Sequence, residues 1–122
     1  MPVITAESAP VFDADGNTIT GLASPSRGAR DVAAWRVRLE PGTPSPRHTL
    51  TREETFIVLS GSITAQFADS AETATEGGAL IVPAGVEFFL SAGDEPVEAI
   101  CVLPVGGQAI VDGLTITPPW AK

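Results

Sequence analysis

The residues best suited to chemistry gather in one stretch, PGTPSPRHTLTREETFIVLSG, at residues 41–61. It contains His48, the one histidine of the chain, followed shortly by Glu54. An imidazole beside a carboxylate can move protons, because the carboxylate fixes the tautomer of the ring and raises its pKa toward neutral pH. The same two side chains are ligands that transition metals accept. The stretch therefore offers acid/base chemistry or part of a metal site.

The spacing within this stretch resembles the first motif of the cupin family. That motif reads glycine, five residues, H-x-H, three or four residues, glutamate, six residues and glycine. Gly42, His48, Glu54 and Gly61 occupy the matching places. Leu50 stands where the second histidine would be.

Residues 77–92 resemble the second motif of the same family, which reads glycine, five residues, P-x-G, two residues, histidine, three residues and asparagine. Its glycines and proline are present, but Phe88 takes the histidine position and Ala92 the asparagine position. The resemblance extends over residues 31–104. It implies an all-β fold, namely a single-domain, jelly-roll barrel of antiparallel strands, and a homodimer.

Short strands are the elements that must position these residues. Twelve glycines and eleven prolines separate segments rich in β-branched residues, a pattern that favours a β-sandwich or barrel. No window has a helical period. In residues 31–40, apolar and charged side chains alternate, so one face of that strand is expected to be buried.

We expect one domain in three parts. Residues 1–30 form an N-terminal arm and loop that includes a hairpin, residues 31–104 form the barrel core, and residues 105–122 form a C-terminal strand and cap.

Three further segments carry expectations of their own. Residues 62–67 are expected to pair antiparallel with the motif strand, and residues 69–76 to form an acidic, solvated loop. Phe89 is expected to face outward and to contact a second subunit.

If the cupin register holds, His48 and Glu54 point into the barrel. The resemblance implies a metal held by three histidines and a glutamate, but Leu50 and Phe88 replace two of those ligands. Two ligands seldom hold a transition metal tightly, so no cofactor is expected. The alternative is a divalent transition metal bound by His48 and Glu54 with non-standard ligands.

An apolar pocket inside the barrel is the second expectation, since small-molecule sites are mostly apolar with a few polar groups. The residues predicted to line it are Trp35, Leu50, Phe56, Val58, Phe88 and Leu90.

The resulting function stays open between several classes, and so does the question of whether the protein is an enzyme. One is a protein that binds a small, largely apolar ligand. A second is a metal-independent enzyme, in which His48 and Glu54 are catalytic for an isomerisation, epimerisation, cyclisation or elimination. A third is a metal-dependent dioxygenase or isomerase. The remaining alternative is a structural barrel whose interior is filled by side chains.

Charge and composition exclude other partners. The net charge of −8 argues against nucleic acid, and no apolar run is long enough to span a membrane. The N-terminus has no signal-peptide pattern, and the single cysteine, Cys101, fits a reducing compartment. We therefore expect a cytoplasmic protein with a small-molecule ligand. Six of its seven basic residues lie between Arg27 and Arg52. Four of them, Arg36, Arg38, Arg47 and Arg52, are expected to pair with Glu40 and later carboxylates across the sheet surface. The alternative is that this cluster attracts an anionic ligand.

Overall fold

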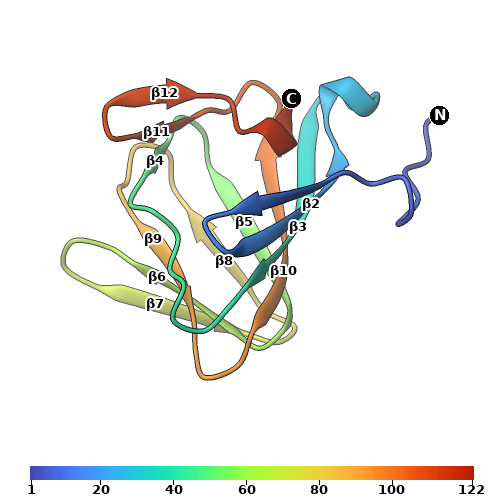
Figure 1. The fold of residues 1–122 in the computed structure, drawn as a ribbon. Helices are drawn as coiled ribbons and strands as arrows, with labels where there is room; N and C mark the ends of the chain where they lie inside the picture. Colours follow the sequence, from blue (N-terminus) through green and yellow to red (C-terminus); the bar gives the residue numbers. More distant parts are fainter.

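The computed structural model describes all 122 residues and contains twelve β-strands, two short 3-10 turns and no α-helix (Figure 1). No helix is therefore available to cross a membrane. The expected all-β fold is confirmed. The elements are β1 (Val11–Ala14), β2 (Asn17–Ala23), η1 (Pro25–Arg27), β3 (Val32–Leu39), β4 (Thr49–Leu50), β5 (Glu54–Ser60), β6 (Ser62–Gln66), β7 (Ala71–Thr75), β8 (Ala79–Val82), β9 (Phe89–Ala92), β10 (Val97–Pro104), β11 (Ala109–Val111), β12 (Leu114–Ile116) and η2 (Pro119–Ala121).

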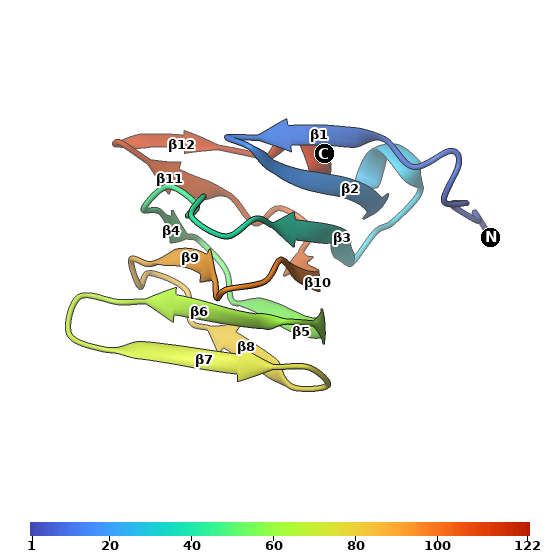
Figure 2. The ribbon, with the colours of Figure 1, turned by 60° about the horizontal axis from the view of Figure 1, so that its bottom comes forward.

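The strands form a jelly roll in which every pairing is antiparallel. One sheet has six strands in the order β1-β2-β3-β10-β5-β8, and two three-stranded sheets, β12-β11-β4 and β7-β6-β9, form the other side. His48 and Phe88 join these smaller sheets through reciprocal backbone hydrogen bonds of 3.0 and 2.9 Å. Figures 1 and 2 show β6 and β7 far from β11 and β12. His48 therefore lies at the junction between the two small sheets.

Alternation of side chains explains the central pair of strands, β3 and β10. Trp35 and Val37 on β3 are buried, as are Cys101 and Leu103 on β10, while the residues between them lie toward solvent. A period of two places alternate residues on one face of a strand, so one face of each strand contributes to the core. The predicted alternation of residues 31–40 is confirmed.

Two local expectations are wrong. Residues 62–66 form β6, which pairs with β7 and β9 and not with β5. Gly61, whose φ is 76°, turns the chain from one sheet to the other, and a Cβ there would lie 2.5 Å from the carbonyl oxygen of Pro96. The expected acidic loop contains β7, an edge strand whose side chains are exposed except for Ala74. Charged and polar residues suit an edge strand because they discourage pairing with other chains.

The N- and C-terminal segments pack onto the same end of the barrel. The expected hairpin is present as β1 and β2, which continue the sheet beyond β3. Its turn has positive φ at Asp15 (53°) and Gly16 (93°), the conformation of a type I′ turn. Trp120, in the C-terminal η2, lies with its ring 6.0 Å from Phe12 and 6.4 Å from Trp35. Aromatic packing thus holds both ends of the chain over β3.

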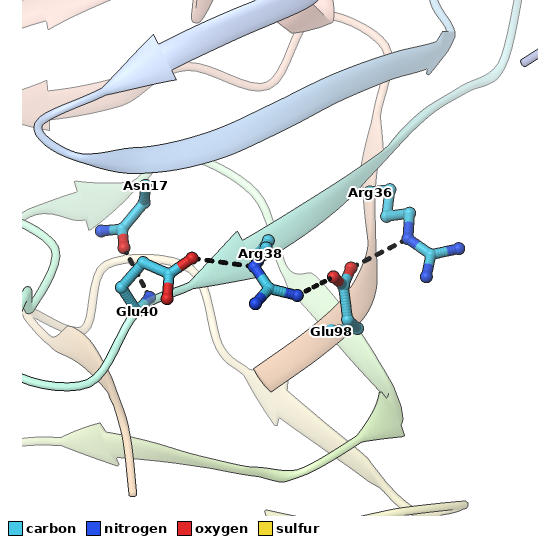
Figure 3. A network of polar contacts seen from close by, with 5 residues as sticks. All are labelled: Asn17, Arg36, Arg38, Glu40 and Glu98. Atoms are coloured by element: carbon cyan, nitrogen blue, oxygen red, sulfur yellow. Dashed lines mark hydrogen bonds and ion pairs between the residues drawn. The ribbon is translucent and has the colours of Figure 1, made fainter. Parts of the chain in front are cut away.

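The outer face of β3 and β10 carries a network of paired charges (Figure 3). Arg36 Nε donates to Glu98 at 2.9 Å, Arg38 Nη1 donates to Glu98 at 3.0 Å, and Arg38 Nε donates to Glu40 at 2.8 Å. Partial burial alone would raise the pKa of Glu98, but the hydrogen bonds from the two arginines outweigh it and lower this pKa. The expected pairing of arginines with carboxylates is confirmed here.

Arg47 and Phe89 form a separate contact on the outside of the barrel. The Arg47 guanidinium lies 4.9 Å from the centre of the Phe89 ring and 3.9 Å from a carboxylate oxygen of Glu87. Phe89 is consequently half-buried and covered by its own chain.

Candidate functional site

A cavity of about 410 Å³ lies inside the barrel and is the one pocket of the structure. Of its 22 lining residues, 14 are hydrophobic. They come from the β1–β2 hairpin, β3, the segment between β3 and β4, β4, β5, β9, β10, β11, β12 and the C-terminal segment, whereas β6, β7 and β8 contribute none. The cavity therefore occupies one end of the barrel, which we call the hollow end. The end formed by β6, β7, β8, Phe88 and the adjoining parts of β5, β9 and β10 is called the packed end.

The six residues predicted to line a pocket divide between these two ends. Trp35, Leu50, Phe56 and Leu90 line the cavity. Val58 and Phe88 do not, and lie instead in the packed end with 1% and 0% of their surface exposed. Val58 follows the lining residues Glu54 and Phe56 on β5 and lies beyond the cavity.

Phe88 is enclosed by other rings. Its centroid lies 6.3 Å from that of Phe56, 6.2 Å from that of Phe67 and 4.4 Å from that of His48. The side chain at the position where the family motif has a histidine therefore packs against His48 and is not itself part of the cavity lining.

Glu54, the first residue of β5, is the buried acid of the cavity. The residue is 4% exposed and lines the cavity. Burial is the cause that raises its pKa to about 8, and no hydrogen bond or charge offsets it. Every side-chain oxygen that is fully shielded from solvent has a hydrogen-bond partner in the structure. The Glu54 carboxyl has no partner, so its oxygens are accessible from the cavity. At pH 7 it is mainly a neutral carboxylic acid that can donate a hydrogen bond into the cavity.

His48 is the base of the same cavity. Its Nδ1 lies 2.8 Å from the carbonyl oxygen of Pro46. A carbonyl oxygen only accepts, so Nδ1 carries the proton and Nε2 of the neutral ring has a free lone pair. Burial lowers the pKa of His48 by more than the hydrogen bond to Pro46 raises it. The ring is therefore mainly neutral at pH 7.

Together, His48 and Glu54 give the cavity one neutral base and one neutral acid. Environments that shift two titratable groups in opposite directions are the usual way in which a site assigns acid and base roles. Such an arrangement can remove a proton from one atom of a bound molecule and donate one to another.

Cys101 and Gln66 are the further side chains that could act as non-standard ligands of a metal if they faced His48 and Glu54. Cys101 lines the cavity, but burial and the nearby Glu54 raise the pKa of its thiol more than a hydrogen bond with Trp35 lowers it. The thiol is protonated and a poor nucleophile. Gln66 is turned away, because its Nε2 donates to the carbonyl oxygens of Phe67 and Ser70, both at 3.1 Å.

The donor set does not fit the metal site of the cupin motif. No three side chains of His, Cys, Asp or Glu gather in a position to hold a metal ion. Leu50, 3% exposed, places hydrocarbon on the cavity wall at one ligand position, and Phe88 places an aromatic ring at another. A tetrahedral or octahedral metal needs more donors than His48 and Glu54 provide.

Several residues of the cavity wall were not identified from the sequence, among them Trp120, Asp13 and Asp15. Trp120 packs against Trp35 and also lines the cavity. Asp13 and Asp15 lie at the exposed rim, next to the turn of the β1–β2 hairpin. The signal that could have found the two acids is the pairing of the hairpin with β3, which places its turn beside the mouth of the barrel.

Comparisons with known proteins agree with this architecture. Residues 35–103 match the family model described as a cupin domain. A polyketide cyclase from Streptomyces resistomycificus superposes with a TM-score of 0.73 and 19% identity, covering 98% of this chain and 82% of that protein. Oxalate decarboxylase from Bacillus subtilis gives a TM-score of 0.72 and 18% identity, with 80% of this chain matched to 28% of that enzyme.

A cupin-2 domain containing protein from Shewanella frigidimarina is 26% identical, with a TM-score of 0.57 over 62% of this chain and 72% of that one. Among curated proteins, none matches the sequence. The structural likenesses below 25% identity concern the fold alone.

Proposed function

The chain belongs to the cupin family, and we propose that it binds a small, largely apolar molecule in the cavity of its barrel. The observation that carries the proposal is the cavity of about 410 Å³ in a chain of only 122 residues. Protein interiors seldom leave voids much larger than a water molecule, and ligand sites usually measure about 300–1,000 Å³. A purely structural barrel of this size would be expected to fill that space.

The polar groups of the cavity favour the proposal of a bound ligand over that of an empty cavity. Glu54 lacks a protein partner although it is 4% exposed, and burying an unpaired polar group costs stability. A bound molecule that accepts a hydrogen bond from its carboxyl, or donates one to Nε2 of His48, would offset part of that cost.

Intrinsic fluorescence offers a direct test of binding. Both tryptophans of the chain line the cavity and there is no tyrosine, so the emission reports on the site itself. We expect members of a library of small apolar molecules to change this emission and to raise the melting temperature. Val37→Phe, which places a ring into the cavity from β3, should abolish both effects. Equal binding by the folded Val37→Phe variant would place the ligand elsewhere and contradict the proposal.

A second candidate function is metal-independent acid/base catalysis on the bound molecule. It is favoured by the opposite pKa directions of Glu54 and His48. In a proton transfer, Nε2 of His48 would take a proton from carbon next to a carbonyl, and the Glu54 carboxyl would donate its proton to the carbonyl oxygen. A cyclisation is one reaction to examine, since a polyketide cyclase shares the fold.

Variants of the two residues separate catalysis from binding. His48→Ala and Glu54→Gln should each remove turnover, whereas the ligand should still quench tryptophan emission at higher concentration, because most of the apolar wall is unchanged. Turnover that survives both changes would contradict the acid/base proposal. The metal-dependent alternative is tested by the metal content of protein grown with iron, manganese, nickel and zinc. Near-stoichiometric metal that survives mild chelation would favour that alternative and would require ligands beyond His48 and Glu54.

A further inference from the structure

We infer that the cavity selects a positively charged ligand, namely an organic amine with an apolar or aromatic body. This inference rests on the proposed function and names the class of molecule for the same cavity. It is carried by the charges on the cavity wall, by one buried acid without a partner, and by the aromatic side chains around it.

The wall of the cavity carries acids and no cationic side chain. Its lining includes Asp13, Asp15 and Glu54 but no lysine or arginine. Neither rim aspartate takes part in an ion pair, because the four ion pairs of the structure involve other residues. A carboxylate or phosphate entering here would meet like charge at the rim and no counter-charge inside.

The arginines near this end contact other groups, including Arg47, which lies between the lining residues Pro46 and His48 and has its guanidinium over the Phe89 ring. Arg27 uses Nε to donate to the carbonyl oxygen of Leu22 at 2.8 Å and Nη2 to donate to that of Trp120 at 3.3 Å. Arg36 and Arg38 lie on the outer face of β3 and pair with Glu98 (Figure 3). These contacts leave the negative charge of the rim uncompensated.

The interior offers a positive group two kinds of partner. Glu54 is 4% exposed and has no partner in the protein. An ammonium group beside it would favour the ionised form of the carboxyl, which would release its proton on binding and accept from the ammonium. Trp35, Trp120 and Phe56 also line the cavity, and the two tryptophan rings lie 6.4 Å apart at 57°. Aromatic faces attract cations, most strongly when water is excluded. The net charge of −8 would also draw cations toward the protein.

The test uses three molecules of similar shape and different charge: phenylpropylamine, phenylpropanol and phenylpropanoate. Each is titrated into the whole protein at pH 7, with tryptophan emission and calorimetry as readouts. We expect the amine to bind at least about tenfold more tightly than the alcohol, and the carboxylate most weakly. An alcohol that binds as tightly as the amine would overturn this inference and leave the proposed function standing.

Two further outcomes would also overturn the inference. The first is a carboxylate that binds most tightly. The second is the absence of binding by all three molecules. In that second case, binding of the apolar library, and its loss in the Val37→Phe variant, still test the proposed function independently.

A pair of double variants locates the charge that matters. Asp13→Asn with Asp15→Asn should weaken amine binding severalfold and leave alcohol binding unchanged. Asparagine tolerates the positive φ of 53° at position 15, so the turn is preserved. The control, Asp94→Asn with Glu95→Gln, removes the same number of charges at an exposed turn outside the cavity and should leave amine binding unchanged. An equal loss in both double variants would overturn the role of the rim.

Discussion

The hollow and the packed ends of the barrel are made of similar residues and differ in how the interior is filled. In the packed end, Ile63, Val82, Phe88 and Val97 each have 0% of their surface exposed, and no pocket lies among them. In the hollow end, mostly buried apolar residues surround a cavity of about 410 Å³. Figure 2 shows the strands of the packed end gathered away from the two terminal segments.

The difference indicates that the two ends of this small domain have different roles. The packed end supplies stability through close contacts, whereas the hollow end retains a buried acid without a partner, an arrangement that costs stability. Sites that break the rules of good packing are expected where function requires them. His48 lies at the boundary, with Phe88 against its ring on the packed side and the cavity on the other.

The largest effect should follow from removing the ring of Phe88. Phe88→Ala should lower the free energy of unfolding by about 3–5 kcal/mol, because it deletes a large side chain from a solid region. Phe56→Ala is the matched change in the hollow end and should cost less, since that ring already faces a cavity. Urea denaturation of both variants measures the difference. Equal losses would contradict the distinction between the two ends.

The pH dependence of stability should reveal the buried acid of the hollow end. The folded pKa of Glu54 is raised to about 8 from an ordinary value of 4.5, so between these values the folded state keeps a proton that the unfolded state has lost. Stability therefore falls as pH rises through this window. Each pKa unit is worth about 1.4 kcal/mol, and access of water to the cavity reduces the total to the order of 3 kcal/mol.

Glu54→Gln should flatten the fall in stability between pH 6.5 and 8, as followed by urea denaturation across pH. The other titratable groups of the cavity do not reproduce this slope. His48 has a lowered pKa and costs stability only as the pH falls, while Cys101 affects stability only near and above its ordinary pKa of 9.0, where the unfolded thiol loses its proton. Asp13 and Asp15 are exposed at the rim. Parallel curves for wild type and Glu54→Gln would show that the carboxyl is solvated.

Substitutions that enlarge a buried side chain should have a smaller effect on the free energy of unfolding, and this effect should differ between the two ends. Val82→Phe forces a ring into the packed end and should destabilise the protein by about 1–3 kcal/mol. Val37→Phe adds the same atoms to the wall of the cavity, where space exists, and should change the free energy of unfolding by less than about 1 kcal/mol. Denaturation curves of the two variants test this. A larger loss for Val37→Phe would mean that the cavity cannot accept a ring.

The same contrast explains what the sequence could predict. Period-two alternation identified the inward residues of β3 correctly, because it depends only on neighbouring residues in one strand. Alternation shows which side chains face inward but not how far the packed end extends along the barrel axis. For that reason, Val58 and Phe88 were predicted to line the pocket. The likeness to the cupin motifs predicted the fold, since their spacing reflects the turns between strands.

Contacts between distant segments left no local signal. Trp120 reaches the cavity because the C-terminal segment packs across β3, and Asp13 reaches the rim because the hairpin pairs with that strand. Gly61 looked like a hairpin turn, but the chain crosses there from one sheet to the other. Such placements depend on the packing of the whole domain and could not be read from neighbouring residues.

The smallest effect should come from Glu98, on the outer face of β10 beside the packed end, whose partners are exposed arginines. Glu98→Gln should lower stability at pH 7 by less than about 1 kcal/mol, and less in high salt, because exposed ion pairs are screened. The folded pKa of Glu98 is lowered, so its contribution is present above the ordinary pKa of 4.5 and lost as the pH falls. Its pH dependence is therefore opposite in sign to that of Glu54. Urea denaturation at pH 3, 7 and 9 should show the Glu98→Gln effect vanish at low pH and the Glu54→Gln effect grow at high pH. If both variants changed stability in the same direction with pH, the two glutamates would share one environment, contrary to a buried acid at the hollow end and a solvated ion pair at the packed one.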